Sequence, residues 1–212
     1  MAKTVKQTAR RDRIEAAAYA VLHDVGYKSA SLLAVARRAG ASNETLYNWY
    51  ENKQALFRSL VETNALHAKQ QLEDSLAKND DPLAALSALG PILLALVVSE
   101  KAVTLNRAAA GDVKDTATLG PAIAALGRNT IVPLLRELIA RAERSNLIAC
   151  EDSMEATEIY IRLLIGDLQI RRVIGVLDEL SPHDIDKRAQ QAFALFLRLY
   201  PRDAPTGKGT LE

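Results

Sequence analysis

Short polar side chains follow a glycine near the N-terminus, on a segment that could place them against the edges of DNA bases. Residues 29–53 read SASLLAVARRAGASNETLYNWYENK, which predicts two short helices, 32–39 and 43–50, with Gly40 suited to the reversal between them. The apolar residues of both helices can share one small core, which leaves four side chains of the second helix outside it: Asn43, Thr45, Tyr47 and Asn48. Such a helix can enter the major groove of DNA with its N-terminal turn nearest to the bases. A plain helical corner without DNA binding is the alternative interpretation.

The sequence lacks the residue patterns that common enzyme mechanisms need. It contains no G-x-S-x-G, no P-loop, no G-x-G-x-x-G and no H-E-x-x-H motif. None of His23, His67 and His183 follows a Glu by three residues, as a di-iron helical bundle would require. Cys150 has no neighbouring His to serve as a base, so it is either an inert buried thiol or a redox sensor. We therefore expect no enzyme activity, no metal site and no cofactor.

The formal net charge of +1 over 212 residues conceals two parts of opposite sign. Residues 1–53 carry nine Lys or Arg and five acidic residues, a surplus of +4, whereas the rest of the chain carries 18 basic and 21 acidic residues. Six of the ten aromatic residues also lie before position 58. This asymmetry favours a basic nucleic-acid-binding part, with an ordinary solvated surface as the alternative. A third possibility is a helical adaptor that binds only protein, which would need no basic recognition helix. Salt-sensitive DNA binding would distinguish a DNA-binding protein from such an adaptor.

Helical periodicity runs through the whole sequence, and it is divided by glycine, proline and capping residues. The predicted caps are Ser31, Ser42, Asn52, Asp81, Ser99, Asp152 or Ser153, and Ser181. The predicted helices are 10–25, 32–39, 43–50, 53–78, 82–98, 100–110, 121–145, 153–177 and 183–199. Gly90-Pro91 is expected to kink or split the helix 82–98, Pro133 to kink the helix 121–145, and Gly111 to end the helix 100–110. The prediction is an all-α chain with a three-helix helix-turn-helix domain (1–53), a connecting helix (54–78), a larger helical bundle (79–200) and a disordered tail (201–212).

Residues 31–57 resemble the DNA-binding domain of the TetR family of bacterial transcriptional regulators. The matching positions run in order and without gaps: Ala39-Gly40, Ser42, Thr45-Leu46-Tyr47, Trp49-Tyr50 and Asn52-Lys53-Gln54-Ala55-Leu56. Glu44 departs from the pattern, since the family usually has Gly, Ala or Pro there; it could accept from a cytosine amino group or favour the helix amino end. The resemblance implies a ligand-responsive repressor that binds a palindromic double-stranded DNA operator as a homodimer.

The resemblance and the residue chemistry assign roles on the DNA-binding surface. Asn43 and Thr45 are candidates for contacts with base edges, because an amide can pair with adenine. Tyr47 is expected to reach a phosphate or a thymine methyl group, and Lys53 a phosphate. The remaining candidates contact the DNA backbone or the groove edge: Ser31, Ser42, Asn48 and Trp49. Trp49 could instead only shield the core. A basic N-terminal arm could reach an adjacent groove with Lys3, Lys6, Arg10, Arg11 and Arg13.

The C-terminal part is expected to form the dimer. Residues 159–177 are apolar on more than one face, and Phe193, Phe196 and Leu197 form a stripe on the last helix. A helix that is apolar around most of its circumference must be buried on two sides, and a homodimer provides the second side. The alternative is that the core of the bundle uses all of this apolar surface.

The effector of this bundle leaves a weak signature. The polar candidates for ligand contacts are Asn106, Arg107, Asn129, Arg162 and Asp167, with Thr130 and Gln169 as further polar residues in the same helices. Aromatic residues are rare after Phe57, so an aromatic cage for a bulky cation is not expected and a small or aliphatic effector is. Residues 99–112 resemble the AefR-like subgroup of C-terminal domains. The longest apolar run, 91–98, is too short to span a bilayer, so we expect a cytoplasmic protein without a membrane partner.

Overall fold

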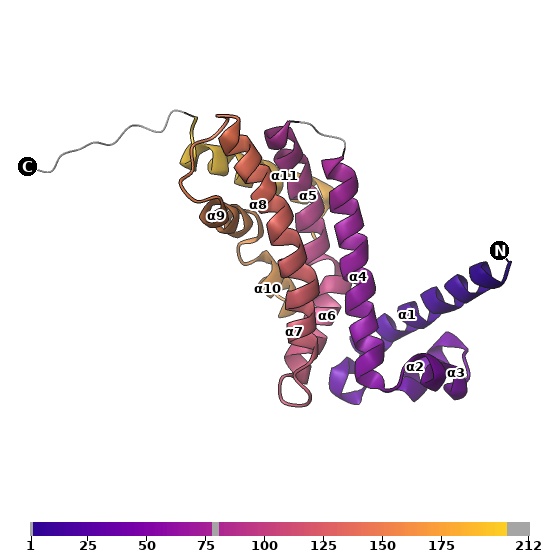
Figure 1. The fold of residues 1–212 in the computed structure, drawn as a ribbon. Helices are drawn as coiled ribbons and strands as arrows, with labels where there is room; N and C mark the ends of the chain where they lie inside the picture. Colours follow the sequence, from indigo (N-terminus) through magenta and orange to yellow (C-terminus); the bar gives the residue numbers. More distant parts are fainter. Residues whose placement is uncertain (1, 78–80, 203–212) are drawn as a thin grey trace, which may run out of the picture.

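The computed structural model describes residues 2–77 and 81–202, and these fold as an all-α chain without strands, as the sequence predicts (Figure 1). In chain order the helices are α1 (Ala2–Ser29), α2 (Leu32–Ala39), α3 (Asn43–Trp49), α4 (Lys53–Leu76), α5 (Pro82–Val98), α6 (Glu100–Asp112), α7 (Leu119–Ile123), the π-helical turn η1 (Ala124–Arg128), α8 (Asn129–Arg144), α9 (Ser153–Ile165), α10 (Leu168–Val173) and α11 (Pro182–Leu199). The predicted tail lies outside the described residues beyond Arg202.

The predicted capping residues begin the helices in the structure. The Oγ of Ser31 accepts a hydrogen bond from the N–H of Ala34, and the Oγ of Ser42 accepts one from the N–H of Thr45. The same contact opens four later helices, through Asp81, Ser99, Asp152 and Ser181. Because each cap satisfies an N–H that has no partner inside its helix, these starts follow from local sequence alone.

The N-terminal segment differs from the prediction. The sequence predicts a helix over 10–25 preceded by a basic arm, whereas α1 begins at Ala2, so the arm belongs to the helix. The helix breaks at Gly26, where the prediction ends it, and resumes as far as Ser29. Figure 1 shows the N-terminal half of α1 projecting beyond the rest of the fold.

The predicted helix 153–177 is wrong beyond residue 165. Gly166 ends α9 with φ 51° and ψ −128°, a backbone conformation that L side chains rarely adopt. A Cβ at this position would also lie 2.9 Å from the Nη2 of Arg188, whose Nε donates to the carbonyl of Leu164. The chain therefore turns here and forms the short helix α10 before α11 begins.

Two smaller boundaries also differ. The helix α5 keeps its predicted bounds and continues through Gly90 and Pro91 without splitting, whereas α6 continues through Gly111 to Asp112. The predicted helix 121–145 contains the π-helical turn η1 between α7 and α8, and Pro133 lies inside α8. The pattern of capping residues, glycine and proline predicts where helices begin and end, but it does not predict a π-helical turn inside a helix.

Two hydrophobic clusters form the core. The first joins α1, α2, α3 and the start of α4 to α6 and α7, and includes Ile14, Val35, Leu46 and Phe57. The second joins the end of α4 to α5, α8, α9 and α11, and includes Tyr160 and Phe196. The first cluster thus also contains residues from 105–122, which the sequence assigns to the C-terminal bundle. The long helix α4 contributes to both clusters (Figure 1).

Within the described residues, no single helix is long and apolar enough to cross a membrane. Only α5 and α6 together would pass that test of length and composition, as a pair bent by 49° at their junction.

Candidate functional site

The turn between α2 and α3 orients the candidate recognition helix. Gly40 adopts a left-handed conformation (φ 60°, ψ 36°), and the N–H of Ala41 donates to the carbonyl of Ala36 over 3.0 Å. Leu46 is fully buried and Tyr50 is 7% exposed, both within the first cluster. Because α3 is anchored by this face, its opposite face is directed to solvent.

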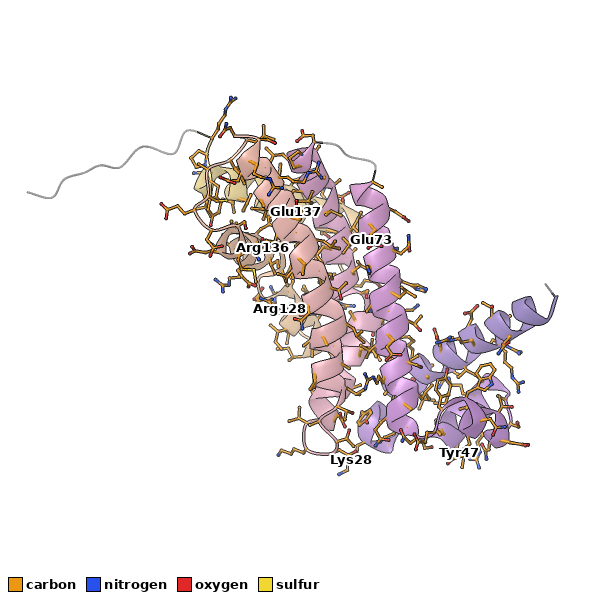
Figure 2. The ribbon with its side chains drawn as sticks, in the orientation of Figure 1. Lys28, Tyr47, Glu73, Arg128, Arg136 and Glu137 are labelled. Carbon is orange, nitrogen blue, oxygen red and sulfur yellow. The ribbon has the colours of Figure 1, made fainter. Side chains whose placement is uncertain are left out.

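The opposite face of α3 carries the polar residues named from the sequence. Ser42, Asn43 and Asn48 are exposed, and the ring of Tyr47 is 59% exposed. Figure 2 shows Tyr47 at the outer edge of the end formed by α2 and α3. No hydrogen bond within the described residues engages the amide of Asn43. The amide is free to donate and accept at a base edge.

Thr45, by contrast, is held by an arginine from another helix. The Nη2 of Arg10 donates to the Oγ1 of Thr45 over 2.6 Å, and the hydroxyls of Thr45 and Ser42 lie 2.8 Å apart. The Arg10 guanidinium also lies 5.7 Å from the centre of the Trp49 ring. Arg10 therefore belongs to the same surface as three predicted DNA contacts. The sequence predicts only that Arg10 belongs to a basic arm, because the periodicity of one helix does not show which side chains of another helix it contacts.

Lys53 and Ser31 occupy the starts of two helices near the end of α1. The Lys53 ammonium donates to the carbonyl of Tyr27 over 3.0 Å and lies 4.2 Å from the centre of the Tyr27 ring. Its half-buried position leaves two N–H groups for a further partner. Ser31 is exposed at the start of α2.

A buried carboxylate closes the connection between α6 and α7. Asp112 is fully buried, and its oxygens accept from the hydroxyl of Thr116 (2.6 Å) and from the backbone N–H groups of Thr116, Thr118 and Leu119 (3.1, 2.8 and 3.1 Å). Burial alone would raise the pKa of Asp112, but these hydrogen bonds to the charged form outweigh it and lower the pKa to about 2. The carboxylate thus stays ionised and orders the loop beside α1.

The pKa of Asp112 predicts an acid-sensitive contribution to stability. Its value in the folded chain lies below the ordinary 3.8, so the contribution is present above about pH 4 and is lost as the pH falls towards 2. The loss is expected to be on the order of 2 kcal/mol. Urea unfolding at several pH values, for wild type and Asp112→Asn, measures it. Equal pH slopes for the two proteins would contradict the assignment.

A half-open cavity of about 310 Å³ lies between the connecting helix α4 and the larger bundle. Aliphatic side chains and small residues from α4 to α9 make most of its wall, and four lining residues are polar: Asn64, Asn106, Arg128 and Gln169. Its volume falls within the range of small-molecule sites, at the low end. The arrangement can enclose a mostly apolar molecule.

The five polar ligand candidates lie in different places. Asn106 lines the cavity. Arg107 instead donates to the carbonyls of Arg172 and Val173, over 2.9 and 2.8 Å. Asn129 and Arg162 are exposed outside the lining, and Asp167 is exposed just before α10. Of the five candidates, only Asn106 is among the described lining residues. The other polar lining residues are Gln169, one of the further polar residues named from the sequence, and Asn64 and Arg128, which the sequence does not predict.

The described residues contain no group of three or more His, Cys, Asp or Glu that could hold a metal ion. Cys150 is half-buried, and burial, with the nearby Glu143 and Asp152 carboxylates, raises the pKa of its thiol. A raised pKa keeps the sulfur in the thiol form, which is the less reactive form.

Two family models match the chain. The model for bacterial regulatory proteins of the tetR family matches residues 14–60, and the model for the C-terminal domain of AefR-like transcriptional repressors matches residues 84–202. No curated protein sequence matches the chain.

Solved structures with the same fold cover most of the chain. A protein from Mesorhizobium loti assigned to the TetR-family regulators is 21% identical and has a TM-score of 0.77, with coverage of 91% of this chain and 97% of that one. A TetR transcriptional regulator from Agrobacterium tumefaciens is 26% identical, with a TM-score of 0.68 and coverage of 90% and 94%. The regulator FadR from Bacillus subtilis, solved in complex with stearoyl-CoA, is 14% identical, with a TM-score of 0.70 and coverage of 87% and 96%.

Proposed function

Because the chain belongs to the TetR family, whose members are DNA-binding transcriptional repressors and not enzymes, we propose that it is a ligand-responsive repressor that binds a palindromic operator as a homodimer. The observation that carries the proposal is the face of α3, where Asn43, Tyr47 and Asn48 are exposed while Leu46 anchors the helix. We further propose that residues 1–53 bind DNA, that 54–78 connect, and that 79–200 bind the effector and form the dimer. This role places the protein in the cytoplasm, where the chromosome lies.

We propose two kinds of DNA contact, one to the edges of bases and one to the DNA backbone and groove edge. Asn43 reads a base edge, and Thr45 is positioned for a second base contact by its hydrogen bond from Arg10. Tyr47 reaches a phosphate or a thymine methyl group. The backbone and groove-edge contacts come from Ser31, Ser42, Asn48, Trp49 and Lys53.

Selection of bound sequences from a random pool of double-stranded DNA tests the function. Two inverted half-sites are expected, with centres separated by about 34–36 Å or a multiple of it, because a twofold dimer presents two recognition helices to one face of the duplex. Enrichment of no sequence, together with DNA binding that does not change with salt, would overturn the proposal and favour a protein-binding adaptor.

Lys53→Ala is expected to weaken binding to operator and random DNA alike. The slope of log affinity against log salt is negative, and each lost phosphate contact should reduce its magnitude by about 1, counted once per protomer. Fluorescence anisotropy titrations at several salt concentrations measure the slope, and Lys69→Ala, on the exposed side of α4, is the matched control. If Lys53→Ala keeps the wild-type slope, Lys53 serves only to hold Tyr27.

Exposed apolar residues on the last helices support the dimer. Leu195 and Leu199 lie one turn apart on α11 and are 43% and 57% exposed, and Met154 on the neighbouring α9 is 41% exposed. An apolar stripe of this kind favours burial against a second copy. Analytical ultracentrifugation should find a dimer for wild type and a folded monomer for Leu195→Glu; a monomeric wild type at micromolar concentration would refute the dimer.

The cavity supports the ligand response because it touches the connecting helix. Val61, Asn64 and Ala65 of α4 line it, and three residues separate the start of α4 at Lys53 from the end of α3. A molecule that favours one position of α4 would thereby change the position of the recognition helix. In the FadR neighbour the bound molecule is stearoyl-CoA. Operator affinity that stays constant at saturating effector would contradict this coupling.

A further inference from the structure

The wall of the cavity is aliphatic and contains few polar groups. Branched side chains come from α5, α6, α7, α8 and α9, among them Leu93, Leu105, Ile131 and Ile161. Among the described lining residues, none is aromatic and none is acidic. A bound molecule is therefore held mainly by burial of apolar surface, and the four polar residues decide which head group it carries.

Two of the polar residues turn their amide nitrogens to the backbone. The Nδ2 of Asn106 donates to the carbonyl of Ala102 over 2.8 Å, and the Nε2 of Gln169 donates to the carbonyl of Val97 over 3.3 Å. These bonds fix which end of each amide faces the helix, and they leave the carbonyl oxygens Oδ1 and Oε1 without a partner in the described part of the chain. The cavity thus offers hydrogen-bond acceptors at two positions.

The one cation among the described lining residues is Arg128, which is exposed on one side and already has a carboxylate partner. The Arg128 guanidinium forms an ion pair with the carboxylate of Glu158 on α9. Asn64 has no hydrogen bond within the described residues and can both donate and accept. An entering carboxylate would lose its hydration, face two carbonyl oxygens and find no unpaired positive charge, whereas a hydroxyl would find the acceptors it needs.

We propose that this cavity binds a neutral aliphatic molecule that carries a hydroxyl group, which donates to the carbonyl oxygen of Asn106 or Gln169, and that it discriminates against the corresponding carboxylate. The proposal rests on the proposed function, since it names the chemical class of the effector for the same site.

Three probes separate the contributions of the head group, and each is titrated into the full-length protein by calorimetry without DNA. They are decanol, its isomer methoxynonane, which lacks a donor, and decanoate, which is charged. Decanol is expected to bind about tenfold more tightly than methoxynonane, because one hydrogen bond of about 1.4 kcal/mol separates them, and at least tenfold more tightly than decanoate. Decanoate or methoxynonane binding as tightly as decanol would overturn the proposal, and so would the absence of decanol binding.

Substitutions in the wall identify the residues responsible. Asn106→Leu and Gln169→Met remove the acceptors at nearly constant volume, and at least one of them should reduce the preference for decanol over methoxynonane about tenfold. Gln71→Met, an exposed glutamine on α4 outside the lining, is the matched control and should keep the preference. Unchanged preferences in both cavity variants would overturn the assignment of the acceptors.

A reverse substitution tests the role of the ion pair. Glu158→Gln leaves Arg128 without its carboxylate partner, so decanoate should bind about tenfold more tightly than it binds to wild type, while decanol binding stays the same. Operator binding is measured separately by anisotropy. If decanol binds the cavity but does not alter operator affinity, the chemical class stands and the ligand response in the proposed function fails.

Discussion

Asn43→Ala is expected to reduce affinity for the operator by ~30- to 10⁴-fold. A bidentate amide contact with a base contributes about 1–3 kcal/mol of discrimination, and a dimer carries the substitution twice. Asn43 is the residue of α3 best suited to this contact because its amide is exposed and makes no other hydrogen bond, whereas the Thr45 hydroxyl is shared with Arg10 and Ser42.

Anisotropy titrations of the selected operator and of random DNA, for wild type and Asn43→Ala, measure this effect. The loss should be confined to the operator, because a base contact adds nothing to non-specific binding. Gln71→Ala removes an exposed amide from α4 and is the control for the loss of an amide as such. An equal loss on both DNAs would show that Asn43 contacts a phosphate.

Asp112→Ala is expected to lower the free energy of unfolding by about 3 kcal/mol or more. Hydrogen bonds to a charged group contribute about 1.5–3 kcal/mol each, and buried N–H groups left without a partner add a further cost. Three backbone N–H groups and the Thr116 hydroxyl depend on this one carboxylate. The loop from Asp112 to Leu119 joins α6 to α7, and both helices pack into the core of the helix-turn-helix.

Urea unfolding of wild type, Asp112→Ala and Asp115→Ala measures the contribution of Asp112. Asp115 lies in the same loop, but it is exposed and its carboxylate makes no hydrogen bond within the described residues, so its replacement should change the stability by less than about 0.5 kcal/mol. Similar losses in the two variants would show that the buried carboxylate has no special role in ordering this loop.

Predictions based on neighbouring residues agree well with the structure. Ser31, Ser42, Asp81 and Ser181 each cap the helix that the sequence assigns to them. Gly40 provides the left-handed turn. A cap or a turn is completed within about four residues, so its energy is already present in the local sequence.

Predictions that depend on distant residues agree less well. The helix 153–177 ends early at Gly166, where the last turn of α9 is held by Arg188, a residue 22 positions later that donates to the carbonyl of Leu164. No local pattern marks Asp112, and its burial depends on the packing of α6 against α1. Among the ligand candidates, Asn106 and Arg107 are adjacent in the sequence, yet one lines the cavity and the other donates to two backbone carbonyls at the end of α10.

By itself the sequence determined the all-α class, the helix-turn-helix and the positions of its two short helices, because periodicity, caps and the glycine turn act over short distances. Only the tertiary structure decided which side chains meet across helices: Arg10 with Thr45, Arg128 with Glu158, and the amides of Asn106 and Gln169 with backbone carbonyls. These contacts depend on how helices far apart in the chain pack, and packing decides which polar groups remain free for a ligand.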